Sequence, residues 1–316
     1  MYKKILVILL IIFSQLGFSQ STPAFNTEEI SVNSLISGTL FQPEKITKRA
    51  NLVILIAGSG PTDRNGNQKG MTNNSLKFLA EELSKTGTSV FSFDKRIIMQ
   101  IKNGTVDESK LSFDDMVADA VAVVDYFSKS KNYKNVVIAG HSEGSLIGML
   151  AATNNVQGFI SIAGSGRPIN EILEEQILKQ LPNVKDELHQ KLELLKEGKI
   201  FDPKSMNAFI APLFRDSVQP YMISWIKYNP QIEIQKLNIP VLIINGDKDL
   251  QISVFEAELL KKARPSAKLN IILNMNHIFK VISGDTSENM ASYNNSTMPI
   301  AADLVVKINA FINELR

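Results

Sequence analysis

The chain of 316 residues is 44% hydrophobic and 21% charged, and its mean hydropathy is close to zero. This composition is typical of a soluble globular protein and excludes a disordered chain, a collagen-like repeat and a polytopic membrane protein. The net charge of +2 gives no reason to expect nucleic acid or an anionic membrane surface as a partner. The lack of cysteine excludes disulfides, thiolate catalysis and thiolate metal sites.

The first 19 residues have the pattern of a secretory signal peptide. Lys3 and Lys4 form a short basic start, and an unbroken apolar run follows from Ile5 to Phe13. Gly17 and Ser19 lie where a cleavage site requires small residues. Because the apolar run is shorter than the roughly 20 residues that span a bilayer, we expect cleavage after Ser19 rather than a retained membrane anchor. The protein is therefore expected to be exported, to the periplasm or the cell exterior.

Short apolar runs recur along the rest of the chain. Glu29–Phe41 predicts an antiparallel hairpin. Six later runs are mostly continuous rather than alternating, which is typical of strands covered on both faces in a parallel sheet. These runs are Leu52–Ala57, Thr88–Phe93, Asn135–Ala139, Phe159–Ala163, Val241–Asn245 and Leu269–Leu273.

Helical patterns alternate with these strands. Ser112 and Asp115 have the spacing of a capping box, and Ser253 and Glu256 repeat that spacing later in the chain. The alternation of strands and helices predicts an α/β fold with right-handed crossovers. The predicted helices outside the interruption described next are Ser75–Lys85, Phe113–Lys129, Ala257–Arg264 and Leu304–Leu315.

Residues 167–236 interrupt the alternation. They lie between two predicted strands and carry only helical or irregular signals, with helices expected over Glu171–Leu181 and Lys185–Lys196. A connection of this length is more than a loop, so we interpret it as a helical cap inserted between the two parts of a sheet domain, residues 20–166 and 237–316. Of six large cap side chains, we expect one or two to line an acyl pocket: Met206, Phe209, Phe214, Tyr221, Met222 and Trp225.

The candidate nucleophile is Ser142. It lies in the G-x-S-x-G pentapeptide that runs from Gly140 to Gly144, after an apolar strand and before an apolar helix. A serine at the tip of such a turn is held in a strained backbone conformation that exposes its hydroxyl. The two glycines let neighbouring backbone approach without a Cβ clash, and the N-terminus of the following helix favours developing negative charge.

This elbow, in its strand–helix setting, resembles that of the α/β-hydrolase superfamily, and the resemblance extends from about Asn51 to the C-terminus. Residues 57–66 read A-G-S-G-P-T-D-R-N-G. They resemble the H-G-S-G-P-x-D-R-D-G loop after the third strand in a group of bacterial serine carboxylesterases, with Ala57 in place of the histidine and Asn65 in place of the second aspartate. The resemblance implies an α/β-hydrolase fold, with a mostly parallel central sheet, helices on both faces and an inserted helical cap.

The same resemblance assigns an oxyanion hole to the amide N–H groups of Ser59 and Glu143. Acyl transfer forms a negatively charged oxygen, and each preorganised donor to such an oxygen contributes roughly 3–4 kcal/mol in sites of this kind.

Three histidines are candidates for the general base. His141 adjoins Ser142 in the elbow, so its side chain should point away from the serine. His189 lies in a charged helical segment and is expected on the surface. His277 follows a late strand, which is where members of the superfamily carry the base. Elimination and chain order therefore favour His277.

The acid that orients this histidine should follow the strand Val241–Asn245. Two aspartates, Asp247 and Asp249, are available there. The superfamily commonly places the acid at the end of a G-x-x-D sequence in this position, so the resemblance favours Asp249, with Asp247 as the alternative. The resulting order of serine, aspartate and histidine along the chain is that of α/β-hydrolases.

Two charged segments near the elbow are open to more than one interpretation. Asp63 and Arg64 could contact a polar group of the substrate or form an ion pair that fixes their loop. Asp94-Lys95-Arg96 resembles the D-K-R-G-x-G turn of related hydrolases, but residues 97–99, Ile-Ile-Met, replace the glycine-rich continuation. We therefore assign no site role to that turn.

Together these features predict an exported serine hydrolase that cleaves small-molecule carboxylic esters through an acyl-enzyme. Neither a metal nor another cofactor is implied, because the chain contains no H-E-x-x-H or phosphate-binding loop motif. One alternative is an aminopeptidase-like or amide hydrolase of the same fold, with Glu174 or Glu175 holding the substrate amine. A second alternative is a non-catalytic binding protein. The complete serine–aspartate–histidine set argues against this alternative. The sequence gives no prediction of the oligomeric state.

Overall fold

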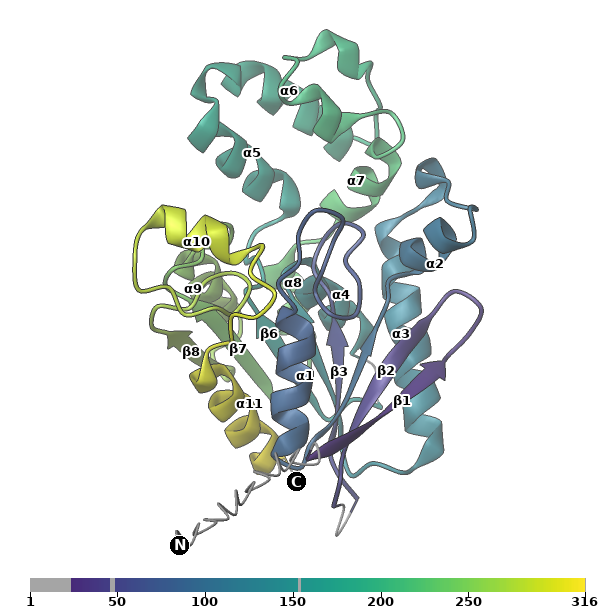
Figure 1. Cartoon of the computed structure of the whole chain (residues 1–316). Coiled ribbons are helices and arrows are strands. Elements are labelled where there is room, and N and C mark those ends of the chain that lie inside the picture. Colours follow the sequence, from purple (N-terminus) through teal and green to yellow (C-terminus); the bar gives the residue numbers. More distant parts are fainter. Residues whose placement is uncertain (1–23, 46–48, 153–154, 316) are drawn as a thin grey trace, which may run out of the picture.

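The computed structural model describes residues 24–45, 49–152 and 155–315, so the predicted signal peptide lies outside the described residues. They form a sheet of eight strands in the order β1-β2-β4-β3-β5-β6-β7-β8 (Figure 1). Within this part of the chain, no helix combines the length and apolar character needed to cross a membrane. The strands are β1 Phe25–Ser31, β2 Ser37–Pro43, β3 Leu52–Ile56, β4 Ser89–Phe93, β5 Val136–His141, β6 Gly158–Ile162, β7 Val241–Gly246 and β8 Lys268–Ile272.

The sheet is mostly parallel. β1 pairs antiparallel with β2, and β2 pairs antiparallel with β4, while all later neighbours are parallel. Every residue of β3 to β7 is buried, which explains why these strands appear in the sequence as continuous apolar runs. The predicted α/β architecture is confirmed, although the hairpin is longer than predicted, since it runs from Phe25 to Pro43.

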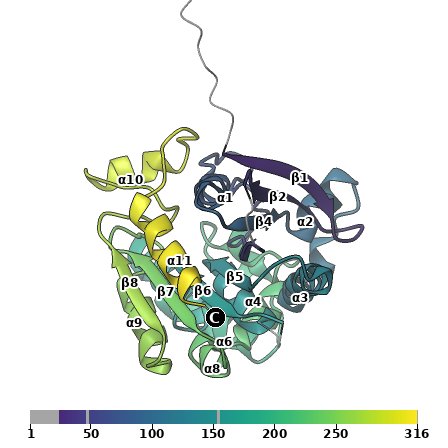
Figure 2. The ribbon, with the colours of Figure 1, turned by 90° about the horizontal axis from the view of Figure 1, so that it is seen from below.

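Helices cover both faces of the sheet. Leu52 and Ile54 of β3 point to the face covered by α3, α4, α8 and α9, whereas Val53 and Leu55 point to the face covered by α1 and α11 (Figure 2). The helices are α1 Ser75–Lys85, α2 Arg96–Lys102, α3 Phe113–Ser130, α4 Glu143–Ala151, α5 Ile169–Gln180, α6 Lys185–Lys196, α7 Gln219–Ile226, α8 Pro230–Gln235, α9 Val254–Ala263, α10 Thr286–Ser292 and α11 Ala302–Glu314.

One of the two predicted capping boxes is present. Ser112 Oγ accepts a hydrogen bond from the Asp115 amide at 3.1 Å, and Asp115 accepts one from the Ser112 amide at 2.9 Å. The second prediction is wrong, because Ser253 makes no side-chain cap and α9 begins three residues earlier than predicted. The Glu256 carboxylate instead pairs with Arg167, a cation at the start of the cap that the local sequence around α9 does not reveal.

The cap helices lie beyond the carboxyl ends of the parallel strands (Figure 1). α5, α6 and α7 surround an apolar cluster of their own, which includes Leu188, Leu192 and Phe214. α8 falls within the predicted cap, but its Ile234 belongs to the core of the sheet domain. The limits of the insertion at residues 167 and 236 therefore stay a prediction.

Candidate active site

Ser142 lies at the junction of β5 and α4 with φ 55° and ψ −121°. A non-glycine residue at positive φ is strained unless its surroundings hold it. Here the Ser142 amide donates to the Ile162 carbonyl at 2.9 Å, and the Ser142 carbonyl accepts from the Ser145 amide at 2.9 Å. A Cβ on Gly140 would lie 2.1 Å from the Gly144 oxygen, and one on Gly144 would lie 2.3 Å from the Ile56 oxygen. The turn therefore requires both glycines.

His277 and Asp249 are hydrogen-bonded to each other. His277 Nδ1 donates to Asp249 Oδ2 at 2.7 Å, and the Asp249 side chain is completely buried. The other carboxylate oxygen accepts from the amides of Gln251 at 2.8 Å and Ile252 at 2.9 Å, so its orientation is fixed. With the proton on Nδ1, the Nε2 atom of His277 is left as the basic nitrogen. Ser142 and His277 line the same small cavity.

The loop that carries His277 is held by buried polar groups. Asn276 Oδ1 accepts from the amides of Ile278 and Lys280, and its Nδ2 donates to Asn289 and Ser292. Asp247, the alternative acid, accepts a hydrogen bond from the amide of Asn274 in the same loop. Asp247 therefore shapes the loop, whereas Asp249 holds the imidazole.

His141 points away from the Ser142 hydroxyl and toward the His277 loop. Its Nε2 donates to the His277 carbonyl oxygen at 2.9 Å, and its ring packs edge-on against Phe279. Burial, reinforced by the neighbouring His277 ring, lowers the pKa of His141 to about 3. The residue is therefore neutral and braces the backbone of the candidate base. His189 lies on the surface, beside Glu174, as the sequence predicts.

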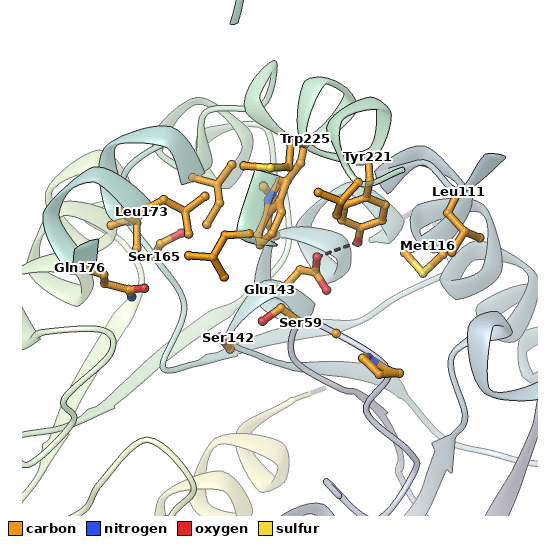
Figure 3. Close-up of a pocket in the computed structure, with 18 of the residues that line it drawn as sticks. Ser59, Leu111, Met116, Ser142, Glu143, Ser165, Leu173, Gln176, Tyr221 and Trp225 are labelled. Carbon is orange, nitrogen blue, oxygen red and sulfur yellow. Dashed lines mark hydrogen bonds between the residues drawn. The ribbon is translucent and has the colours of Figure 1, made fainter. Parts of the chain in front are cut away.

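Glu143 follows Ser142 and takes part in a buried polar cluster. Lys95 Nζ lies 2.5 Å from Glu143 Oε2, and the Tyr221 hydroxyl donates to Glu143 Oε1 at 2.6 Å (Figure 3). Burial, and then the Glu143 charge, raise the pKa of Tyr221 well above its ordinary range, so its hydroxyl stays a donor. Lys95 also donates to the Gly58 carbonyl at 2.8 Å. The cluster thus joins the elbow, the residue 57–66 loop and the cap.

The sequence did not identify Lys95 as a site residue, and this omission is corrected by the structure. β4 ends at Phe93, and α2 begins at Arg96 and runs through residues 97–99, which replace the G-x-G of the related D-K-R-G-x-G turn. Lys95 reaches into the site, where it donates to the Gly58 and Gly60 carbonyls of the loop that has Ala57 in place of the histidine of the related loop. The available signal was a lysine two residues after the buried strand β4, which neighbours β3, the strand that leads into the Ser59 loop.

A chamber of about 330 Å³ separates the elbow from the cap. Ser142, Ser59 and Glu143 line its floor (Figure 3). Four of the six cap side chains considered in the sequence line it, rather than the expected one or two: Phe214, Tyr221, Met222 and Trp225. The other two face elsewhere, because Met206 packs inside the cap cluster and Phe209 is 80% exposed.

The amides of Ser59 and Glu143 are available to an incoming ligand. Glu143 is the first residue of α4, so its N–H has no acceptor within the helix. The Ser59 N–H donates to no acceptor among the described residues. The loop of Ser59 also passes close to the serine, since a Cβ on Gly58 would lie 3.2 Å from Ser142 Cβ.

Asp63 and Arg64 do not pair with each other, so an ion pair between these two residues does not fix the loop. Arg64 instead pairs with Asp94 at 2.7 Å and with Glu29 of β1. Asp63 accepts from backbone amides of its own loop, which gives the loop its turn. Neither side chain lines the chamber. Across the described ranges, no cluster of three or more histidine or acidic side chains could hold a metal ion.

Comparisons with known proteins agree with this architecture. Residues 70–279 match the family described as serine aminopeptidase S33, Hydrolase_4. Esterase EstD of Thermotoga maritima is 27% identical over 285 residues, which cover 85% of this chain and 63% of that protein. The chain thus spans less than two thirds of that relative's length.

Solved structures share the fold at low sequence identity. Est1E from Butyrivibrio proteoclasticus has a TM-score of 0.58 at 17% identity, with 91% of this chain and 99% of that chain covered. The esterase Pf2001 of Pyrococcus furiosus has a TM-score of 0.52 at 12% identity, with coverage of 92% and 90%. The fold is therefore that of an α/β-hydrolase. The chain belongs to the Hydrolase_4, serine aminopeptidase S33, family.

The buried Lys95–Glu143 pair predicts an asymmetric effect on stability. Lys95→Met would leave the Glu143 carboxylate buried without its cation and should lower the free energy of unfolding by about 3–5 kcal/mol. The double variant Lys95→Met with Glu143→Leu should lose less, because no charge is then buried alone. Urea unfolding followed by the fluorescence of Trp225, the single tryptophan, measures both losses. A double variant less stable than Lys95→Met would contradict this interpretation.

The low pKa of His141 predicts a contribution to acid sensitivity. Above a pH of about 6.5, the histidine is neutral in both the folded and the unfolded chain. Below that pH only the unfolded chain takes up the proton until the pH approaches 3, so the free energy of unfolding falls. Replacing the ring by His141→Phe should therefore reduce the stability lost between pH 7 and pH 5 by about 2 kcal/mol. Equal losses in the two proteins would show that His141 does not titrate in this way.

Proposed function

We propose that the protein hydrolyses carboxylic esters, with Ser142 as nucleophile, His277 as general base and Asp249 as the acid that orients it. The observation that carries this proposal is the His277–Asp249 hydrogen bond at the cavity that His277 shares with Ser142. The strained turn supports it further, because such a turn presents the serine hydroxyl to a substrate.

In the proposed reaction, His277 Nε2 removes the Ser142 proton as Oγ attacks the ester carbonyl carbon. The amides of Ser59 and Glu143 donate to the oxygen that becomes negatively charged. The protonated imidazole, stabilised by Asp249, then gives its proton to the leaving alcohol oxygen. A water molecule, activated by the same imidazole, releases the acid from Ser142 and restores the enzyme.

The charges that line the chamber favour an ester over an aminoacyl substrate. An aminopeptidase needs a carboxylate that is free to bind the substrate ammonium group. The two carboxylates that line the chamber already have cations, since Glu143 pairs with Lys95 and Glu108 pairs with Arg215. The acidic residues considered in the sequence, Glu174 and Glu175, do not line the chamber. Glu175 pairs with Arg167 and Lys179, and Glu174 lies beside His189.

Substitutions of the two aspartates test the proposed roles. Asp249→Asn should lower kcat for p-nitrophenyl butyrate by roughly 10⁴-fold, because the amide no longer fixes the required tautomer of His277. Ser142→Ala should remove turnover and labelling by a fluorophosphonate. Asp247→Asn is the matched control, and it should keep activity within a few-fold of the wild type because its oxygen can still accept from the Asn274 amide.

Wild-type turnover by Ser142→Ala, or equal losses in the two aspartate variants, would contradict the assignment. Aminoacyl p-nitroanilides, assayed alongside, decide between the two hydrolase classes. Faster cleavage of these amides than of the ester would favour the aminopeptidase alternative.

We also propose export of the protein, supported by the basic and apolar pattern of residues 1–19. N-terminal sequencing of the protein recovered outside the cytoplasm tests this proposal.

A further inference from the structure

Two cavities of different size meet at Ser142. The chamber beneath the cap has a volume of about 330 Å³, and a second cavity has a volume of about 70 Å³. Ser59, Ser142 and Gln251 line both of them. An ester bound with its carbonyl carbon at the serine must place its acyl group on one side and its alcohol on the other. Each cavity would therefore hold one of these two groups.

The linings of the two cavities differ in chemistry. Most residues of the chamber are apolar, and they come from both the cap and the sheet domain; they include Leu111, Met116, Leu146, Ile172, Leu173 and Trp225. The smaller cavity is lined mainly by polar side chains of the sheet domain. Gln68 in that lining is held by the Ser59 carbonyl and the Thr62 hydroxyl, and Gln251 donates to the Tyr293 hydroxyl at 3.1 Å. Its walls are therefore fixed by hydrogen bonds rather than by apolar packing.

The position of His277 decides which half of the substrate enters which cavity. His277 lines the smaller cavity and is not part of the chamber lining. The general acid must lie within hydrogen-bond distance of the leaving oxygen when it delivers the proton. The alcohol therefore leaves on the side of the smaller cavity, and the acyl group occupies the chamber. The opposite orientation would place the leaving oxygen among apolar side chains, away from the imidazole.

From this arrangement we propose a substrate class, which rests on the proposed function: esters of a bulky apolar acid with a small alcohol. The volume of the chamber is more than four times that of the alcohol cavity. A chain of several methylene groups gains free energy on leaving water for the chamber, by about 0.8 kcal/mol per group. The same chain on the alcohol would meet polar walls that are fixed by hydrogen bonds, so it would not gain this free energy. Selectivity should therefore depend on which side of the ester carries the chain.

Two isomeric esters test the proposal directly. Methyl octanoate and heptyl acetate have the same composition and differ in the side of the ester that carries the long chain. We expect kcat/KM for methyl octanoate to exceed that for heptyl acetate by at least about tenfold. Equal values, or a preference for heptyl acetate, would overturn the proposal. If neither these esters nor p-nitrophenyl butyrate is hydrolysed, the proposed function itself fails.

Two variants test the roles of the two cavities one at a time. Leu173→Trp partly fills the chamber from the cap and should lower the ratio of kcat/KM for methyl octanoate to that for methyl acetate by about tenfold. Met71→Ala widens the smaller cavity and should raise kcat/KM for butyl octanoate relative to methyl octanoate. The proposal is wrong if Leu173→Trp slows methyl acetate as much as methyl octanoate, or if Met71→Ala leaves the ratio of the two octanoates unchanged.

Discussion

The site depends on the strained backbone of Ser142. Its φ of 55° is tolerated because β5 and α4 hold the residue on both sides and because Gly140 and Gly144 lack side chains. The absence of a Cβ on Gly144 lets α4 pack within van der Waals contact of the end of β3, from which the Ser59 loop continues. The conformation of this turn therefore sets the position of the serine hydroxyl and of the free Glu143 amide. It also sets the distance between α4 and the Ser59 loop.

A buried ionic cluster connects this turn to the rest of the site. Glu143 lines the chamber, and its side chain is held by Lys95 and by Tyr221 of the cap. Lys95 also binds carbonyl groups of the loop that carries Ser59. The two amides that we propose as the oxyanion hole are thus positioned through a single cation. The same contacts neutralise the charge of Glu143 in the chamber, which leaves that cavity suited to an apolar group.

Features that depend on local sequence were predictable. Continuous apolar runs gave the buried strands, and α1 and α6 occupy the predicted residues. The Gly-x-Ser-x-Gly turn pointed to Ser142, elimination and chain order pointed to His277, and the resemblance to α/β-hydrolases pointed to Asp249. The structure brings His277 and Asp249 into hydrogen-bond contact. The strand and helix predictions succeed because the periods of strands and helices are encoded over short stretches of chain.

Features that depend on distant partners were not predictable. Nothing in the sequence indicated that Arg64 pairs with Asp94 rather than with Asp63. Nor did it indicate that Glu256 pairs with Arg167 instead of completing the predicted capping box. Lys95 was set aside because its turn departs from the related pattern, and the short helix α2 that replaces the glycines was not expected. The number of cap residues in the chamber was underestimated, because helical spacing alone does not show which side of α7 faces the sheet domain.

The central claim is that the turn hydroxyl, the late imidazole and two backbone amides act on one reacting carbon. A crystal structure of the protein after reaction with an alkyl phosphonate inhibitor tests it most directly, since the tetrahedral phosphorus imitates the intermediate of acyl transfer. The account predicts phosphorus bonded to Ser142 Oγ, with its oxygen within about 3.1 Å of the Ser59 and Glu143 amide nitrogens. Phosphorus on another residue, or an oxygen remote from both amides, would contradict it.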